Sequence, residues 1–183
     1  ISYIDESGFN YHLRRTKPRS KINASACVSL PTVRGRNVSL IAAMNIDGII
    51  WHEIISHSSV NSNIFSAFLQ RLFIKLAEIN LNSVWLIMDN ASIHHTEEVR
   101  NLIEQTSRTL IFLPPYSPMM NPIEEVFSKI KFFARNMLAD PTNGVNLEGI
   151  INQSFATVTS SNCYKYFMNM FMKLPAAAAK EYL

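Results

Sequence analysis

The chain of 183 residues has only two cysteines, Cys27 and Cys163, which stand far apart and outside any CxxC pattern. This scarcity excludes a disulfide framework and a structural zinc site, and it favours a reducing compartment. No apolar run reaches membrane-spanning length, and no basic-then-apolar leader precedes Ile1. With 48% hydrophobic and 17% charged residues, we expect a single packed core rather than a disordered chain.

Acidic residues are missing from one long segment. No Asp or Glu occurs from Ser7 to Ile46, whereas this segment holds seven basic residues: Arg14, Arg15, Lys17, Arg19, Lys21, Arg34 and Arg36. A solubilising surface hairpin would explain such a run of charge. Because the segment starts two residues after Asp5, we favour the alternative that it binds a phosphate backbone beside that acid.

Apolar periodicity predicts a mixed α/β sheet flanked by helices. The first strand is expected to end at Asp5, with a turn at Gly8 and Asn10. An Asp-Gly pair between two β-rich runs predicts a hairpin. The expected order is strands at 37–45 and 48–56, a helix at 61–79, a strand at 83–88, a helix at 96–106, a strand at 109–113, and helices from 122, at 146–158 and at 161–173.

Three acidic residues stand where carboxylates can converge. Asp5 and Asp89 each follow an apolar strand at its carboxyl end, where open α/β sheets bind ligands. Glu124 follows Asp89 after 34 residues and stands in the first turn of a helix that Asn121 caps and Pro122 begins. Each acid alone has an ordinary structural explanation. Together, with no cationic partner nearby in sequence, they predict an oxygen-only site for Mg²⁺ or Mn²⁺ of the kind that cuts and joins phosphodiesters.

The neighbouring Glu125 is the alternative third ligand. Helical spacing sets Glu124 on one face with Lys131 and Arg135, so that DNA would lie along the helix beside the metal. Glu125 is instead expected to form an ordinary surface pair with Lys129 at i+4. The spacing favours Glu124 without excluding Glu125.

The sequence resembles the catalytic core of mariner-like DDE transposases over roughly residues 1–138. The resemblance is carried by "YIDESGFN", "LIMDNASIHH" and "LPPYSPMMNPIEEVFSKIK", with 34 residues between the last two acids. It implies a ribonuclease-H-like fold, a mixed five-stranded sheet flanked by helices, with 139–183 as C-terminal helices that pack on or extend this core. It also implies two divalent metal ions, Mg²⁺ or Mn²⁺, held by Asp5, Asp89 and Glu124, and thereby selects Glu124 over Glu125.

The resemblance further implies cleavage of DNA at transposon ends followed by strand transfer into target DNA. In two-metal catalysis one ion activates a water or a 3′-hydroxyl, and the other stabilises the leaving oxygen. Asn90 and His94 share the "DNAxxH" element and are expected to support the site. His94 would contact phosphate or orient a carboxylate, or be an ordinary histidine satisfied by backbone.

The implied partners are DNA and, in the full-length protein, a second copy of the chain. Such a protein would act in the nucleus of a eukaryote, or otherwise in the cytoplasm and nucleoid. Because the chain opens on a strand without an initiating Met, we expect a helix-turn-helix DNA-binding domain upstream of Ile1. Two alternatives stay open: a domesticated or inactive relative that binds DNA or protein without cutting, and a ribonuclease-H-type nuclease.

Overall fold

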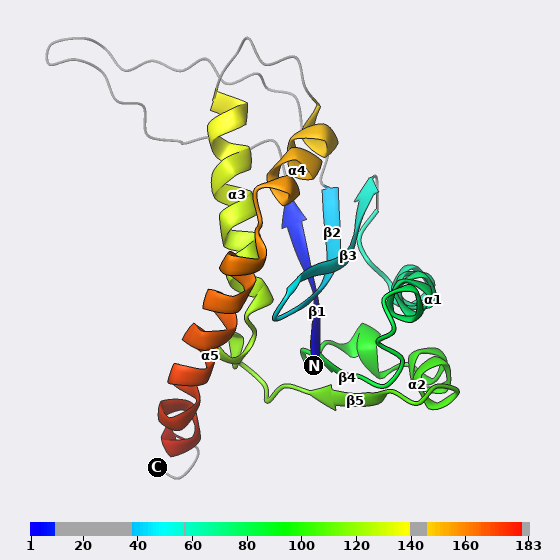
Figure 1. The fold of residues 1–183 in the computed structure, drawn as a ribbon. Helices are drawn as coiled ribbons and strands as arrows, with labels where there is room; N and C mark the ends of the chain where they lie inside the picture. Colours follow the sequence, from blue (N-terminus) through cyan, green and yellow to red (C-terminus); the bar gives the residue numbers. More distant parts are fainter. Residues whose placement is uncertain (10–37, 57, 140–145, 181–183) are drawn as a thin grey trace, which may run out of the picture.

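A mixed five-stranded sheet forms the centre of the molecule, as the sequence predicted (Figure 1). The computed structural model describes residues 1–9, 38–56, 58–139 and 146–180. The strands lie in the order β3-β2-β1-β4-β5; the β3–β2 and β2–β1 pairs are antiparallel, and the β1–β4 and β4–β5 pairs are parallel. Their bounds are Ser2–Phe9 for β1, Val38–Asn45 for β2, Gly48–Ser56 for β3, Trp85–Met88 for β4 and Thr109–Phe112 for β5.

The helices begin where the sequence places polar capping residues. Asn61, Thr96 and Asn146 each accept a hydrogen bond from a backbone N–H in the first turn of the helix that follows them. The α-helices are α1 at Ser62–Glu78, α2 at Glu97–Glu104, α3 at Ile123–Ala139, α4 at Leu147–Ala156 and α5 at Ser160–Lys180. Short 3₁₀ helices follow β4 and β5: η2 at Ser92–His95 and η3 at Pro118–Met120.

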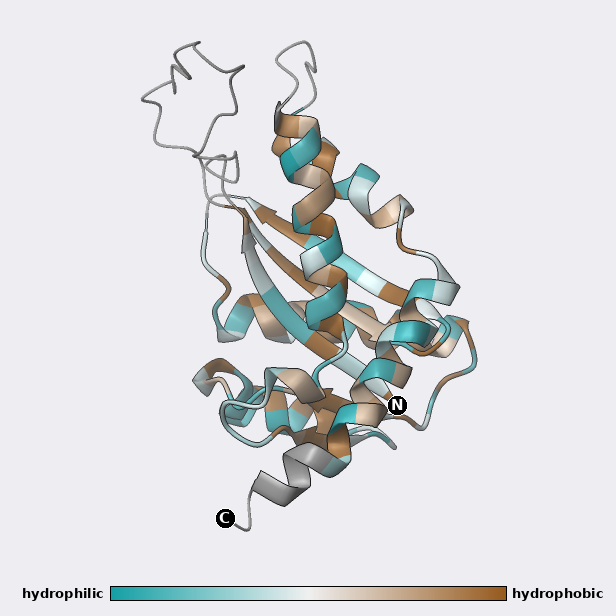
Figure 2. Ribbon diagram, turned by 90° about the vertical axis from the view of Figure 1, so that its left-hand side faces the viewer, coloured by the Kyte–Doolittle hydropathy of each residue, from teal (hydrophilic) through white to brown (hydrophobic). Residues whose placement is uncertain are grey.

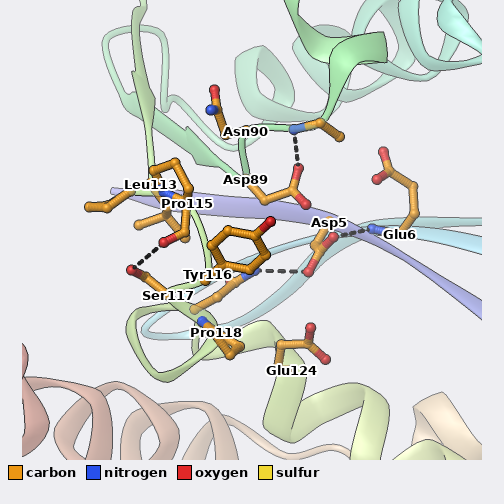
Figure 3. Close-up of a pocket in the computed structure, with 13 residues that line it drawn as sticks. Asp5, Glu6, Asp89, Asn90, Leu113, Pro115, Tyr116, Ser117, Pro118 and Glu124 are labelled. Carbon is orange, nitrogen blue, oxygen red and sulfur yellow. Dashed lines mark hydrogen bonds between the residues drawn. The ribbon is translucent and has the colours of Figure 1, made fainter.

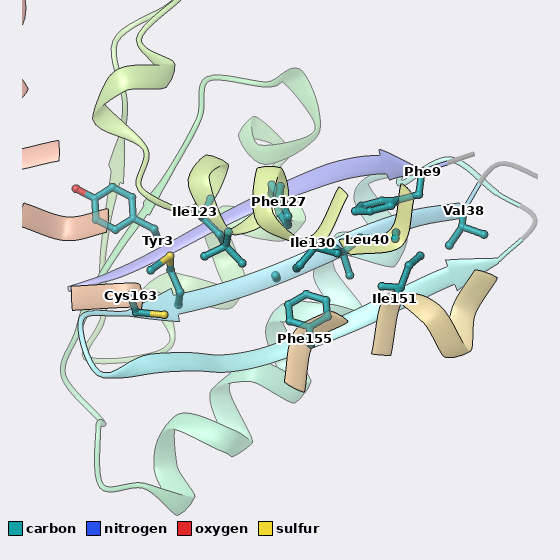
Figure 4. Packing of buried hydrophobic residues seen from close by; sticks show 14 of the residues in the cluster. Tyr3, Phe9, Val38, Leu40, Ile123, Phe127, Ile130, Ile151, Phe155 and Cys163 are labelled. Atoms are coloured by element: carbon teal, nitrogen blue, oxygen red, sulfur yellow. The ribbon is translucent and has the colours of Figure 1, made fainter. Parts of the chain in front are cut away.

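Two hydrophobic cores cover the two faces of the sheet. Helices α3, α4 and α5 pack on one face, where Tyr3 and Phe9 of β1 meet residues such as Phe127 (Figure 4). Helices α1 and α2 pack on the other face against Ile4 of β1 and the apolar residues of β4. The sheet is rich in hydrophobic residues, and the covering helices mix hydrophobic with hydrophilic ones (Figure 2). Tyr3 and Ile4, which are neighbours in β1, point into different cores.

The first strand is longer than the sequence predicted. The expected end at Asp5 and the expected turn at Gly8 are wrong, because β1 continues to Phe9. Antiparallel pairing with β2 explains the extension, since it runs from Tyr3 opposite Met44 to Phe9 opposite Val38. Parallel pairing with β4 stops earlier, at Ile4 opposite Met88. Asp5 thus stands inside a strand but just past the end of the parallel pairing.

The C-terminal helix buries one stripe of its surface. Cys163, Phe167 and Met170 of α5 are buried, whereas Tyr164, Met168 and Phe171 are 40–54% exposed. The buried positions are spaced by four and three residues, and the exposed stripe lies one residue round the helix. Trp85, at the start of β4, is also 54% exposed. Within the described part of the chain, no helix combines the length and apolarity needed to cross a membrane.

Candidate active site

The three predicted acids line one pocket at the end of the parallel strands. The pocket has a volume of about 550 Å³ and lies between β1, the turn after β4, the loop after β5 and the start of α3 (Figure 3). Its lining residues are Asp5, Glu6, Asp89, Asn90, Ala91, Leu113, Pro114, Pro115, Tyr116, Ser117, Pro118, Asn121 and Glu124. No Lys or Arg is among the described residues that line it.

Asp5 stands at the centre of this group of acids. Its side chain is 6% exposed, and the register of β1 against β4 sets it level with Asp89. Its two oxygens accept hydrogen bonds from the Glu6 backbone N–H at 2.7 Å and from Asn121 Nδ2 at 2.8 Å. Burial raises the pKa of Asp5 to about 8, and the charges of Glu6, Glu124 and Asp89 add to that rise. A carboxyl in this environment does not ionise readily without a bound cation.

Asp89 is held by the short helix that follows it. Its Oδ1 accepts a hydrogen bond from the Ala91 N–H at 3.0 Å and lies 3.0 Å from His94 Nδ1. The imidazole of His94 is fully buried, and its Nε2 lies 3.0 Å from Glu6 Oε1. His94 therefore links two of the acids that line the pocket.

The charge of His94 depends on its carboxylate neighbours. Burial lowers the pKa of His94, but the hydrogen bond and charge of Glu6, together with the carbonyl and carboxylate of Asp89, outweigh burial and raise it overall. The ring of Phe65 on α1 packs against the imidazole at 4.4 Å between ring centroids. Hydrogen bonding on both nitrogens and packing on one face fix the orientation of the ring.

Glu124 enters the pocket from the first turn of α3, on the other side of Asp5 from Asp89 (Figure 3). The helix begins at Ile123 rather than at the predicted Pro122. Asn121 donates its side-chain amide to Asp5 instead of capping the helix with it, and only its backbone carbonyl accepts from the Glu124 N–H, at 3.2 Å. Asn121, which was expected to cap the helix, thus connects the start of α3 to β1.

Glu125 points away from the pocket. Its carboxylate accepts from Asn169 Nδ2 at 3.3 Å and lies 3.8 Å from Lys173 Nζ, both on α5. The predicted pair between Glu125 and Lys129 is wrong, because Lys129 Nζ donates to the Thr157 carbonyl and to the side chain of Asn162. Contacts between helices far apart in sequence override the local i+4 spacing.

The remaining predicted residues lie at varying distances from the pocket. Asn90 is exposed at its rim, and its side-chain oxygen contacts His95 Nε2. Lys131 lies on α3 with its ammonium 5.5 Å from the centre of the Phe9 ring, and Arg135 is exposed one turn further on. The predicted DNA-binding residues Arg14, Arg15, Lys17, Arg19, Lys21, Arg34 and Arg36 lie outside the described residues.

The donor chemistry of the pocket fits a hard divalent cation. Among the described residues, no three His, Cys, Asp or Glu side chains lie close enough to hold one ion as they stand. The pocket nevertheless offers carboxylate oxygens without a competing cation, and the buried Oδ1 of Asn121 beside Asp5 has no hydrogen-bond partner in the described structure. Mutual repulsion keeps uncompensated carboxylates apart, and a divalent ion would remove that repulsion.

Sequence reasoning missed three residues of the pocket. Glu6 was overlooked because attention went to its neighbour Asp5. The period-two alternation of a strand predicts that the Glu6 side chain lies on the opposite face, which is where His94 lies. Asn121 was interpreted only as a helix cap. Tyr116 carried no signal, because its backbone conformation, with φ of +57°, cannot be inferred from the sequence "PPYSP".

Comparison with protein families gives one match, to the family described as DDE superfamily endonuclease, over residues 1–140. No curated protein sequence matches the chain significantly. Among solved structures, the chain is similar to a pre-cleavage Mos1 transpososome, with a TM-score of 0.78 and 18% identity, covering 98% of this chain and 55% of that chain.

Two further structures extend this similarity. The Mos1 strand transfer complex gives a TM-score of 0.70 and 20% identity over 96% of this chain and 52% of that one. The catalytic domain of Mos1 mariner transposase gives a TM-score of 0.66 and 17% identity, covering 92% of this chain and 76% of that one. The TM-scores establish a common fold, so the ribonuclease-H-like architecture expected from the sequence is confirmed. The chain spans about half the length of the proteins in the two assembled complexes.

Proposed function

Because this chain belongs to the DDE superfamily endonucleases, we propose that it is the catalytic domain of a cut-and-paste DNA transposase. Its reaction is metal-dependent cleavage of DNA at transposon ends, followed by strand transfer into target DNA. Its partners are these DNAs and, in the full-length protein, a second copy of the chain. Such a protein acts where the DNA is, in the nucleus of a eukaryote or otherwise at the nucleoid.

The observation that carries this proposal is the shared pocket of Asp5, Asp89 and Glu124. Each acid comes from a different element, and the described pocket lining contains no basic residue to neutralise them. Asp5 is buried and its charge is opposed by the neighbouring acids, so ionising it costs folding free energy. An arrangement that is unfavourable for stability and directed into an open pocket indicates a site for a charged ligand.

The three acids would hold two divalent ions, Mg²⁺ or Mn²⁺. When bound, such ions activate a water or a 3′-hydroxyl as nucleophile and stabilise the leaving oxygen of the phosphodiester. The chain's own residues set the positions of the ligands. Asn121 holds Asp5 by a hydrogen bond of 2.8 Å, and His94 holds Asp89 through Nδ1 at 3.0 Å.

The path of the DNA follows α3 away from the pocket. Glu124 lies beside Asp5, and Lys131 lies over Phe9, so the helix runs along β1 from the acids toward the end of that strand. The basic segment with its seven cations begins just after Phe9. We infer that DNA passes from the acids over Lys131 and Arg135 toward this segment, since phosphates are attracted by clustered basic side chains.

A matched pair of neighbouring glutamates tests the site. The assay is nicking of supercoiled plasmid in Mn²⁺, with Asp89→Asn as a second site variant. We expect Glu124→Gln and Asp89→Asn to lose nicking by at least about 100-fold, because each removes a ligand charge. Glu125→Gln should retain it, since Glu125 contacts α5 and not the pocket.

The opposite pattern has a clear meaning. Nicking that survives in Glu124→Gln and disappears in Glu125→Gln would refute the assigned third ligand. Equal nicking by the original chain and by both site variants would refute the whole assignment. Thermal unfolding of each variant separates a loss of activity from a loss of structure.

A further inference from the structure

Tyr116 is the most exposed large hydrophobic residue in the described structure. Its side chain is 99% exposed, yet it belongs to the lining of the acidic pocket (Figure 3). Its backbone has a φ of +57°, in the left-handed region that residues other than glycine and asparagine rarely adopt. Both features are unfavourable for the isolated chain, because the ring buries no area and the backbone is strained.

The loop that carries Tyr116 is fixed at both ends. Before it, the Leu113 N–H donates to the Met88 carbonyl at 2.9 Å, which ties the loop to β4. After it, the Met120 N–H donates to the Ser117 carbonyl at 3.0 Å, and Asn121 is bonded to Asp5. Prolines on both sides of Tyr116 restrict the backbone further. The ring is thus presented from a rigid support beside the acids.

The pocket has two chemically different walls. One wall carries the carboxylates of Asp5, Asp89 and Glu124, and the other is the uncharged segment from Leu113 to Pro118. The uncharged wall has no cation with which to hold a phosphate. Its prolines and its aromatic ring instead suit the flat apolar face of a nucleobase, since every base can stack on an aromatic side chain.

We propose that Tyr116 is a stacking platform for the base next to the phosphate that is cut. This inference rests on the proposed function, because it requires DNA to occupy the pocket. The base is held without regard to its identity, since stacking uses the π-face and not the hydrogen-bonding edge. The strained backbone aims the ring, and the phosphate beside the stacked base is thereby directed toward the acids.

The test uses a short DNA duplex with a frayed end whose first unpaired base is 2-aminopurine, which loses fluorescence when it stacks. Binding is measured in Ca²⁺, a cation that takes oxygen ligands. We expect the original chain and Tyr116→Phe to quench the probe. Tyr116→Ala should abolish the quenching and weaken binding about 5- to 150-fold, as expected for the loss of one stacked base.

Two controls isolate the ring from other effects. Tyr116→Gly removes both the ring and the backbone strain, so it should bind like Tyr116→Ala; full binding by the glycine variant would overturn the proposal. Tyr164→Ala removes an exposed tyrosine of α5 and should leave quenching unchanged. Equal loss in this variant would also overturn the proposal.

Failure of the proposal differs from failure of the proposed function. If the original chain nicks plasmid in Mn²⁺ and Tyr116→Ala quenches and binds as well as the original, only the stacking role is refuted. If the original chain neither binds the probe nor nicks plasmid, the transposase function and the stacking role are refuted together.

Discussion

Replacing Asp5 by Asn should stabilise the metal-free protein at alkaline pH. Asp5 is 6% exposed, and burial, followed by the charges of Glu6, Glu124 and Asp89, raises its pKa to about 8. Ionising such a carboxyl in the folded chain is unfavourable, whereas in the unfolded chain it ionises at an ordinary pKa near 3.8. The amide of asparagine has nearly the same shape and carries no charge.

The sign and size of this stability change follow from the coupling between proton binding and folding. Because the native pKa is raised, the folded state binds the Asp5 proton more tightly than the unfolded state does. The stability contributed by this group is fully present below pH 3.8 and is lost as the pH rises through about 8. A shift from 3.8 to about 8 corresponds to at most about 6 kcal/mol, at about 1.4 kcal/mol per pKa unit.

The expected gain is smaller than this limit. Asp5 accepts hydrogen bonds from the Glu6 N–H and from Asn121, and an amide keeps only one oxygen to accept them. Losing one such bond costs about 1 kcal/mol. We therefore expect Asp5→Asn to raise the free energy of unfolding by about 2–5 kcal/mol near pH 8.5, a gain that shrinks as the pH falls toward 4.

Urea unfolding in EDTA across this pH range measures the effect. Glu104→Gln, which alters an exposed acid on α2, is the matched control and should show little change at any pH. Millimolar Mg²⁺ should narrow this difference in stability, because a ligand at a hundredfold excess over its Kd stabilises the chain that binds it by about 2.7 kcal/mol. A stability difference that does not vary with pH, or a loss of stability near pH 8.5 in EDTA, would refute this account of Asp5.

Two further substitutions test the support of the site. His94→Ala should lower the free energy of unfolding by about 2–4 kcal/mol, because it removes buried packing and the partner of Glu6 and Asp89. Since the pKa of His94 is raised, its contribution is fully present below the ordinary value of 6.5 and is lost as the pH rises through the folded pKa, so urea unfolding should find a smaller penalty in alkali. Phe127 lies on the buried side of α3 and is 1% exposed. Phe127→Ala should lower the free energy of unfolding by about 3–5 kcal/mol and reduce nicking by displacing Glu124, as measured by the same unfolding and plasmid assays. A Phe127→Ala chain that is as stable as the original would contradict the described core.

Local signals predicted most of the elements and three of the four acids that line the pocket, all but Glu6. Apolar periodicity gave the helices after Asn61, Thr96 and Asn146 to within a few residues. The Asp-Gly signal gave the hairpin between β2 and β3, where the side chain of Asn45 also accepts from the Asp47 and Gly48 N–H groups. These features depend on neighbours in sequence, which is why sequence patterns reveal them.

The errors share a physical cause, which is competition from partners distant in sequence. Pairing with β2 carries β1 past Asp5, and contacts with α5 draw Glu125 away from Lys129. Asparagine is a common helix-capping residue, but the side-chain amide of Asn121 donates a hydrogen bond to Asp5, which precedes it by 116 residues. No local pattern encodes these choices, since each was decided by packing between elements.

The same competition explains why the acids face an open pocket. Parallel pairing of β1 with β4 ends at Ile4, so Asp5 is the first residue of β1 beyond that pairing, and β4 ends one residue before Asp89. The chain leaves β4 through η2, which brings His94 into contact with both Asp89 and Glu6. Because β1 beyond Ile4 pairs with β2 alone, the space beyond the end of β4 is left for the start of α3 and for Glu124. Shortening β1 at Asp5 would remove the strand along which α3 packs, so the extension that sequence patterns missed is what holds Glu124 opposite Asp89.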